Sequence, residues 1–287
     1  MPILNDEDIQ TRDVLEWKGI HLLHFAGSSC SQKTRIFLQL KGIPWESRHI
    51  NIPERENYTE WFMGINPRGL VPVLVDEGKV IIESNDILNY LEERFPDPPL
   101  IPEARDQEAQ ELLAQEDALH LDLRAICFRY FFPGVPPRPE ELLEKYQSLG
   151  SGTVGGIADP HKDIEMQFHR DVRAHDGVTD EQIRKSVGRF RTALNDLERR
   201  LETAPYLLGD AISLVDIAWY IYNVRLIGAG YPLRELHPHV ADWFDGLDAR
   251  PEFSREVAEP PPLVHGRAEM HARHRANNAT LVHVAGL

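Results

Sequence analysis

Four prolines in seven residues separate two unlike halves of this chain. The stretch PDPPLIP, Pro96 to Pro102, cannot continue a helix and favours extended backbone. Before it, apolar runs alternate between strand and helix periodicity, whereas nearly every long segment after it has helical periodicity. The sequence therefore predicts an α/β domain over residues 20–98 and an all-α domain over residues 103–258.

The α/β half has the order strand, helix, strand, helix, strand, strand, helix over residues 20–96, which is typical of a compact unit with a mixed sheet. We expect three further segments to lie outside these elements. Residues 1–19 form a polar N-terminal extension, and residues near 132–180 form an irregular insertion or lid within the helical domain. Residues 259–287 form a Pro-, His- and Arg-rich tail that wraps the surface or frays.

Composition disfavours several classes of protein. The formal net charge of -15 disfavours a nucleic-acid partner, because phosphate binding requires a basic surface. The best apolar candidate for a membrane span, ISLVDIAWYIYNV, carries Asp216 and is shorter than the roughly 18 apolar residues that a span requires. Two cysteines, Cys30 and Cys127, are too few for a disulfide framework, and the first ten residues are acidic rather than signal-like. We expect a cytoplasmic protein with no membrane partner.

The stretch GSSCSQKTR, Gly27 to Arg35, follows a predicted strand and begins a predicted helix. A helix N-terminus leaves backbone N–H groups unpaired and carries partial positive charge, so it stabilises an anion such as a thiolate. Ser28, Ser29 and Cys30 lie at this point. Taken alone, the pattern is also explained by a serine that caps the helix.

The same stretch resembles the active-site loop of the Zeta-class glutathione transferases, which has the form SSCS followed by a basic residue and an arginine. LKGIPWE, NPRGLVPVL and ESNDILNYLEERFP follow it in the order typical of the glutathione transferase superfamily. In the second half, YLLGDAISLVDIA matches as well, with Ser213 and Asp216 spaced as a capping box. The resemblance implies the glutathione transferase fold: an α/β thioredoxin-like domain that holds glutathione, and an all-α helical domain that shapes the pocket for a second substrate.

The resemblance also implies which residues contact glutathione. Ser28 matches the donor that stabilises the thiolate, and Ser29 lies beside it. The remaining contacts come from two later residue pairs, Val71-Pro72 and Glu83-Ser84.

The first pair matches the family's cis-proline, which presents the Val71 backbone to the cysteinyl part of glutathione. In the second pair, Ser84 at a helix start suits the carboxylate of the γ-glutamyl end and Glu83 suits its ammonium. Without the family, Pro72 is explained as a strand-entry proline and the second pair as a helix cap. The group that would bind the glycine carboxylate is left unassigned. Related enzymes often use a basic or amide group just before the Glu-Trp-Phe segment, and here Asn57 and Tyr58 stand there.

Within the Zeta-like group, SxCSxKTR and a helix of the form SLxDxxWxxxxxRL resemble the tetrachlorohydroquinone reductive dehalogenases. In those enzymes the loop cysteine takes a glutathione off a glutathionyl intermediate, and the resemblance gives this role to Cys30. Arg225, on an otherwise apolar helix, would bind an anionic or phenolic second substrate, and Cys127 lies on a helix expected to line the same pocket. The alternatives are core packing for both cysteines and a salt bridge for Arg225.

We therefore expect a glutathione transferase that binds glutathione and uses its thiolate on a small hydrophobic, aromatic or unsaturated electrophile. Three chemistries stay open: reductive removal of a leaving group, attack on an aryl ether as in bacterial β-etherases, and reversible addition that gives cis-trans isomerisation. A non-catalytic binding or scaffold protein of the same fold is the alternative from a different class. The resemblance implies a homodimer, and the histidines of the tail lack the paired spacing of a structural zinc site.

Overall fold

A computed structural model describes residues 3–287 and divides the chain into two compact units. The N-terminal unit contains the described residues up to Asp97 together with Pro137–Asp171. The helical unit contains Pro98–Pro136 and Val172–Leu287. The first boundary falls inside the proline-rich stretch PDPPLIP, where the chain cannot continue a helix.

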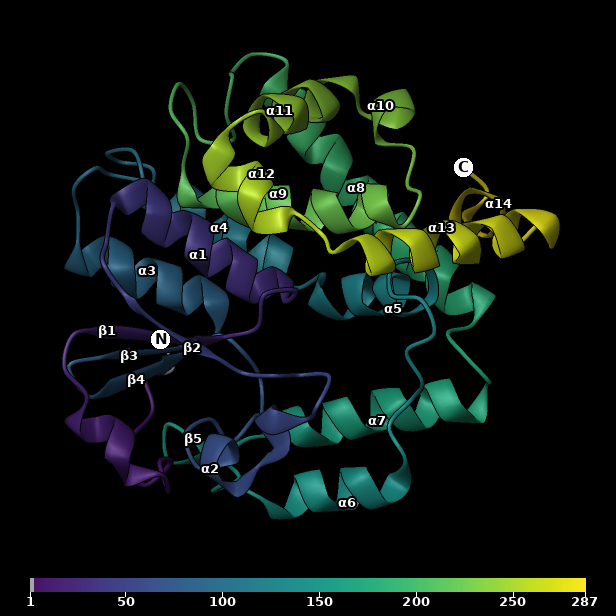
Figure 1. Ribbon diagram of the computed structural model, residues 1–287. Helices are drawn as coiled ribbons and strands as arrows, with labels where there is room; N and C mark the ends of the chain where they lie inside the picture. Colours follow the sequence, from purple (N-terminus) through teal and green to yellow (C-terminus); the bar gives the residue numbers. More distant parts are fainter. Residues whose placement is uncertain (1–2) are drawn as a thin grey trace. The chain divides into compact units, whose positions relative to one another are not determined.

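The N-terminal unit is built on a four-stranded mixed sheet with the strand order β2-β1-β3-β4 (Figure 1). Its strands are β1 (Ile20–His24), β2 (Glu46–His49), β3 (Val73–Asp76) and β4 (Lys79–Ile82). β1 is parallel to β2 and antiparallel to β3, and β3 pairs with β4 as an antiparallel hairpin. The predicted α/β part of the fold class is confirmed.

Helices α1 (Ser29–Lys41) and α3 (Ser84–Arg94) pack together on one face of this sheet (Figure 1). Strand side chains alternate between the two faces, so residues two apart share a face. Val73 and Val75 accordingly belong to the core cluster on the opposite face, which also contains Phe62. Two short elements, η2 (Glu56–Tyr58) and α2 (Glu60–Met63), precede β3 and bring Phe62 to that cluster.

The N-terminal segment also covers the opposite face, which differs from the polar extension predicted for residues 1–19. Leu4, Ile9 and Val14 are buried in the same core cluster, the last of them on the 3-10 helix η1 (Arg12–Glu16). Acidic residues interrupt these apolar positions in the sequence, and they therefore hide the pattern from a periodicity analysis.

Most of the predicted insertion packs in the N-terminal unit rather than in the helical domain to which the sequence analysis assigns it. Its elements are α6 (Glu140–Ser148), β5 (Thr153–Val154), β6 (Ile157–Ala158) and α7 (His161–Ala174). The physical reason is a hydrophobic cluster that joins Leu143, Tyr146 and Met166 to Tyr58 and Met63. The rings of Tyr58 and Tyr146 stack with their centroids 4.6 Å apart.

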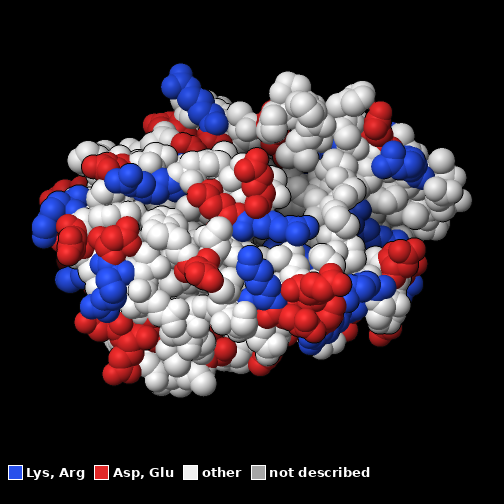
Figure 2. All heavy atoms as spheres, turned by 60° about the horizontal axis from the view of Figure 1, so that its bottom comes forward, with Lys and Arg blue, Asp and Glu red and all other residues white. Residues whose placement is uncertain are grey.

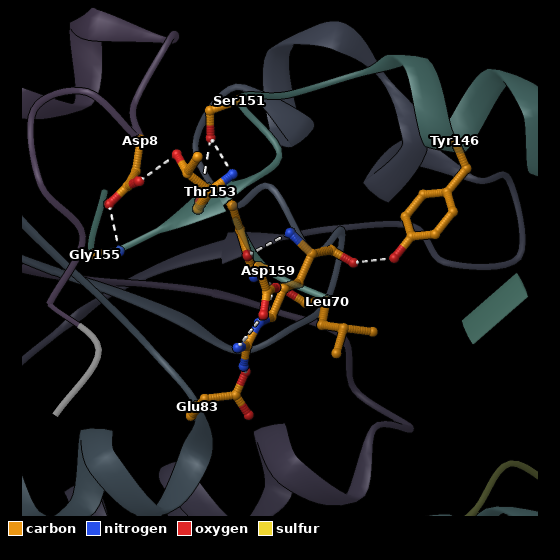
Figure 3. A network of polar contacts seen from close by, with 10 residues as sticks. Asp8, Leu70, Glu83, Tyr146, Ser151, Thr153, Gly155 and Asp159 are labelled. Carbon is orange, nitrogen blue, oxygen red and sulfur yellow. Dashed lines mark hydrogen bonds and ion pairs between the residues drawn. The ribbon is translucent and has the colours of Figure 1, made fainter. Parts of the chain in front are cut away.

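A buried carboxylate attaches the β5–β6 hairpin to the N-terminal segment (Figure 3). Asp8 accepts hydrogen bonds from the Thr153 hydroxyl at 2.6 Å and from the backbone N–H groups of Asn5 and Gly155, each at 2.8 Å. A further bond comes from the N–H of Gly156 at 3.1 Å. Burial opposes ionisation, but these hydrogen bonds outweigh it and hold the pKa of Asp8 below its usual range.

The second unit consists of helices, so the all-α part of the predicted fold class is confirmed as well. Its helices up to the tail are α4 (Asp106–Asp117), α5 (His120–Tyr130), α8 (Asp180–Leu201), α9 (Leu214–Gly228), α10 (Leu233–Leu236), α11 (Pro238–Asp248) and α12 (Pro251–Val257). The almost wholly buried α9 packs against α4, α5 and α11. Ser213 and Asp216 form the predicted capping box at its start.

The tail is helical in the structure, which differs from the prediction that residues 259–287 wrap the surface or fray. It forms α13 (Pro261–Ala276) and α14 (Leu281–Ala285), which pack against α5 and α8 respectively. Leu281 and Val284 are buried there. These apolar residues are too sparse in the tail for periodicity to reveal a helix, and tertiary packing supplies the stabilisation.

Replacing Asp8 with asparagine tests the attachment of the β5–β6 hairpin. An amide cannot accept four hydrogen bonds as a carboxylate does, so we expect Asp8→Asn to lower the free energy of unfolding by about 1–3 kcal/mol. Because the pKa of Asp8 is depressed in the folded state, its stabilisation is present above the unfolded-state pKa of about 4 and is lost as the pH falls through the folded-state value. Urea denaturation at pH 7 and pH 3 measures both effects.

The matched control is Asp6→Asn, since Asp6 forms an exposed ion pair with Arg12. We expect this control to stay within about 0.5 kcal/mol of the parent at both pH values. Equal stability of the Asp8 and Asp6 variants at pH 7 would contradict the assignment.

Candidate active site

Strand register brings three of the predicted segments to one edge of the sheet. Leu23 of β1 pairs with Val73 of β3, and Val73 pairs with Ile82 of β4. The chain leaves β1 and β4 at the edge where it enters β3, because both pairings are antiparallel. The start of α1, the Val71–Pro72 peptide and the start of α3 therefore lie at the same edge.

The first of these segments is the N-terminus of α1. Ser28 is the N-cap residue, and its side-chain oxygen accepts a hydrogen bond from the N–H of Ser31 at 3.3 Å. Ser29 and Cys30 follow in the first turn and are partly exposed. The capping interpretation and the catalytic interpretation are compatible here, because a hydroxyl that accepts one hydrogen bond still has its own hydrogen to donate.

Arg35 holds the loop that leads to this helix. Its guanidinium donates to the carbonyls of Phe25 at 3.3 Å and Ala26 at 3.1 Å, and it lies 3.1 Å from Nδ1 of His24. Burial, together with the positive charge of Arg35, lowers the pKa of His24 to about 4. The neutral imidazole can then accept from Arg35 through Nδ1 while Nε2 donates to the Ser47 hydroxyl at 2.7 Å.

The second segment contains a cis peptide bond between Val71 and Pro72, as the resemblance implies. Amide side chains fix the loop before it: Asn57 donates to the carbonyl of Gly69 at 2.7 Å, and Asn66 donates to that of Leu70 at 2.8 Å. Asn57 is buried and engaged in this way, so its contact gives no support for a role in binding a carboxylate.

The third segment is the start of α3, where Ser84 is buried and Glu83 has a positive φ of 67°. The Glu83 carboxylate accepts a hydrogen bond from Nη1 of Arg68 at 2.6 Å. The same guanidinium donates through Nε and Nη2 to the two oxygens of Asp159, at 2.7 and 2.8 Å. Burial disfavours the charged guanidinium, but the bonds from Asp159 and Glu83 outweigh this effect and raise the pKa of Arg68.

Sequence reasoning missed both Arg68 and Asp159. Arg68 lies inside the motif NPRGLVPVL, where only the Asn-Pro and Gly indicated a turn. Asp159 lies in the insertion, 91 positions further along the chain, and nothing in a single sequence connects the two. An arginine directly before the cis-proline loop was the one available signal that a carboxylate partner was needed.

The two residues predicted for the second substrate lie inside the helical unit. Arg225 is buried on α9, with its guanidinium 4.6 Å from the ring centroid of Phe131 and Nη1 3.8 Å from Oε1 of Glu259. Cys127 is buried on α5, and burial raises its thiol pKa to about 12 against the opposing charge of Arg225. These contacts favour the salt-bridge alternative for Arg225 and the packing alternative for Cys127.

Residues 3–287 contain no group of three or more His, Cys, Asp or Glu side chains placed to hold a metal ion. Over the same residues, no helix has the length and apolar character needed to cross a membrane. Basic and acidic side chains are interleaved on the face shown in Figure 2.

Comparison with known proteins identifies the class to which this architecture belongs. The family model "Glutathione S-transferase, N-terminal domain" matches residues 27–94, and "Glutathione S-transferase, C-terminal domain" matches residues 180–246. A zeta-class glutathione S-transferase of Euphorbia esula is 45% identical over 83 residues, which are 29% of this chain and 37% of that relative. The chain thus spans little more than a third of that relative's length.

Other similarities extend over most of the chain. Protein LigF of Sphingobium sp. strain SYK-6 is 25% identical over 255 residues, covering 81% of this chain and 90% of LigF. The crystal structure of the β-etherase LigF from that strain superposes with a TM-score of 0.65 at 24% identity, over 83% of this chain and 98% of that one. A Burkholderia graminis glutathione transferase, crystallised with two glutathione molecules per subunit, has a TM-score of 0.59 at 25% identity, over 85% and 89% of the two chains.

Two family models in the family's order, on an α/β sheet unit and a helical unit, define the glutathione S-transferase fold. Residues 27–94 and 180–246 thus each match a glutathione S-transferase domain, and over most of its length the chain is similar to proteins of that superfamily.

The contrast between the two cysteines predicts different reactivities. At pH 8 a thiol with a pKa near 12 is ionised in only about one molecule in ten thousand, so we expect buried Cys127 to resist iodoacetamide in the folded protein. Cys30 is partly exposed in the first turn of α1 and is expected to be alkylated first. Peptide mass spectrometry after timed alkylation measures both rates, and Cys30→Ser should abolish the fast phase. Equal rates for the two thiols would show this description of their surroundings to be wrong.

Proposed function

We propose that this protein is a glutathione-dependent enzyme that directs the glutathione thiolate at a small hydrophobic, aromatic or unsaturated electrophile. The observation that carries the proposal is the convergence of the α1 cap, the cis Val71–Pro72 peptide and the Glu83-Ser84 pair at one sheet edge. Relatives named as glutathione transferases, and neighbours crystallised with glutathione, support it.

In this proposal glutathione lies along the edge with its thiol at Ser28. The backbone of Val71 pairs with the cysteinyl part, Ser84 takes the γ-glutamyl carboxylate at the N-terminus of α3, and Glu83 takes the ammonium. Lowering a thiol pKa from about 8.5 by about two units requires roughly 2.7 kcal/mol of selective thiolate stabilisation. A charge-assisted hydrogen bond from Ser28 and the positive end of α1 together supply about that much.

Reductive removal of a leaving group gives Cys30 a defined role. After glutathione has displaced the leaving group, the Cys30 thiolate attacks the sulfur of the glutathionyl substrate. The carbon–sulfur bond breaks, its electron pair takes a proton on the substrate carbon, and a mixed disulfide forms between Cys30 and glutathione. A second glutathione then releases Cys30 as glutathione disulfide forms. Isomerisation needs no such step, because the thiolate adds and leaves again.

Cleavage of an aryl ether is the second candidate. It is favoured by the similarity to LigF, whose sequence aligns over 90% of its length, whereas the zeta-class similarity covers 83 residues. Here the thiolate displaces an aryloxide in one step, and Cys30 again takes no part in the chemistry. A homodimer and a cytoplasmic location belong to the same proposal and rest on the sequence analysis.

Ser28→Ala tests thiolate activation. Removing the hydroxyl should raise the pKa of bound glutathione by about one to two units and lower the rate with chlorodinitrobenzene at pH 7 by about 3- to 25-fold, because the thiolate fraction falls by that factor. Ser28→Thr keeps both the hydroxyl and the helix cap and is the matched control. Ultraviolet titration of the bound thiolate measures the pKa directly. An unchanged pKa in Ser28→Ala would remove Ser28 as the donor, and a parent that binds glutathione but never reacts would favour the scaffold alternative.

Cys30→Ser separates the three chemistries. With a halogenated hydroquinone, the variant should accumulate a glutathionyl conjugate while the parent forms a mixed disulfide on Cys30. With an aryl ether or an isomerisable maleyl compound, the variant should turn over at nearly the parent rate. Mass spectrometry of products and protein distinguishes the cases. Normal dehalogenated product from the variant would assign Cys30 to packing.

A further inference from the structure

The Arg68 ion pairs connect the insertion to the candidate glutathione site (Figure 3). Arg68 stands between two carboxylates, Glu83 at the start of α3 and Asp159 just after the β5–β6 hairpin. All three residues lie in the N-terminal unit. They form one charged cluster, which we call the Arg68 triad.

Exposure within the Arg68 triad is uneven. The side chain of Glu83 is 34% exposed, whereas that of Arg68 is 19% and that of Asp159 is 10% exposed. The hydrogen bond from Arg68 engages Oε1 of Glu83, which leaves Oε2 as an acceptor for another donor. The end of the triad that a ligand can reach is therefore the Glu83 carboxylate.

The charge balance of the Arg68 triad decides what Glu83 attracts. One guanidinium and two carboxylates sum to a net charge of about -1. Without Asp159, Arg68 would neutralise Glu83 alone, and a ligand ammonium would meet a site with no net charge. Asp159 binds Arg68 through two parallel hydrogen bonds, the strongest form of this contact, and so offsets the cation.

Two members of the Arg68 triad, Arg68 and Asp159, are held in place by the insertion. The Tyr146 hydroxyl donates to the Arg68 carbonyl at 2.7 Å, and the N–H of Asp159 donates to the carbonyl of Gly152 at 3.0 Å. The hairpin beside Asp159 is in turn attached to Asp8. Positions fixed in this way need no rearrangement when a ligand binds.

We propose that Asp159 is a positioning residue that holds Arg68 beside the Glu83 carboxylate and leaves the Arg68 triad with a net negative charge for the α-ammonium of glutathione. The inserted segment is thereby a part of the glutathione site, acting through Arg68. This inference rests on the proposed function and deepens it, because it says which groups select a γ-glutamyl ligand that carries an amino group.

The test compares glutathione with a deaminated analogue, in which a glutaryl group replaces the γ-glutamyl group. Calorimetry on the full chain should show that Asp159→Asn weakens glutathione binding by about five- to tenfold and changes binding of the analogue by less than about twofold. Glu140→Gln, which removes a more exposed ion pair with Arg170 in the same insertion, is the matched control and should change neither affinity. An equal loss for both ligands, or a loss for neither, would overturn the proposal.

A second variant keeps the test decisive if Asp159→Asn disturbs the insertion. The double variant Arg68→Gln/Asp159→Asn returns the cluster to a net charge of about -1, carried by Glu83 alone. We expect it to recover at least half of the lost glutathione affinity on a logarithmic scale. A double variant weaker than Asp159→Asn would show that the contacts act through packing and would overturn the inference. Absence of glutathione binding by the parent protein would instead refute the proposed function, and this inference with it.

Discussion

The antiparallel pairing of β3 with β1 and β4 is the constraint on which the candidate site depends. The same register buries Leu23, Val73 and Ile82 in one core cluster and brings the ends of three strands to one edge. A slip of one residue would turn these side chains to the other face of the sheet. The free energy that stabilises the core therefore also fixes the separation between the α1 cap and the start of α3.

The inserted segment changes what that edge can do. Helices α6 and α7 first bury apolar side chains against Tyr58 and Met63. This packing also places polar groups beside Arg68. The Tyr146 hydroxyl donates to the backbone carbonyl of Arg68, and the Asp159 carboxylate accepts from its guanidinium. The sequence predicts an irregular insertion or lid here. The structure instead shows that this segment adds buried apolar side chains and a carboxylate to the N-terminal unit. Hydrogen bonds from Thr153 and Gly155 to Asp8 also attach the N-terminal segment to the insertion.

Local patterns predicted the parts of the fold that depend on neighbours in the chain. The α/β order, a helix N-terminus within Ser28 to Cys30 and the capping box at Ser213 all follow from short-range physics, and the structure has each of them. The Val71–Pro72 cis peptide was anticipated only through the family resemblance.

What the sequence could not supply depends on contacts between distant positions. Arg68 and Asp159 are 91 residues apart, and no local sequence pattern around either residue predicts a contact with the other. The tail becomes helical because α5 and α8 provide surfaces for it, and propensity alone does not indicate this. The sequence left two interpretations open for Arg225 and for Cys127, a place in the substrate pocket or a salt bridge or core contact. For Arg225 the reason is that helical periodicity cannot distinguish a pocket wall from a core when nearly every side of the helix is buried.

We expect glutathione to bind at the one sheet edge that the inserted segment completes. A crystal structure of the protein with glutathione is the decisive measurement. It should show the thiol at Ser28, backbone pairing with Val71, and the γ-glutamyl ammonium within hydrogen-bond distance of Glu83, with Arg68 still bonded to Asp159. Glutathione bound away from this edge, or an Arg68 that has left Asp159 to contact the ligand carboxylate, would contradict it.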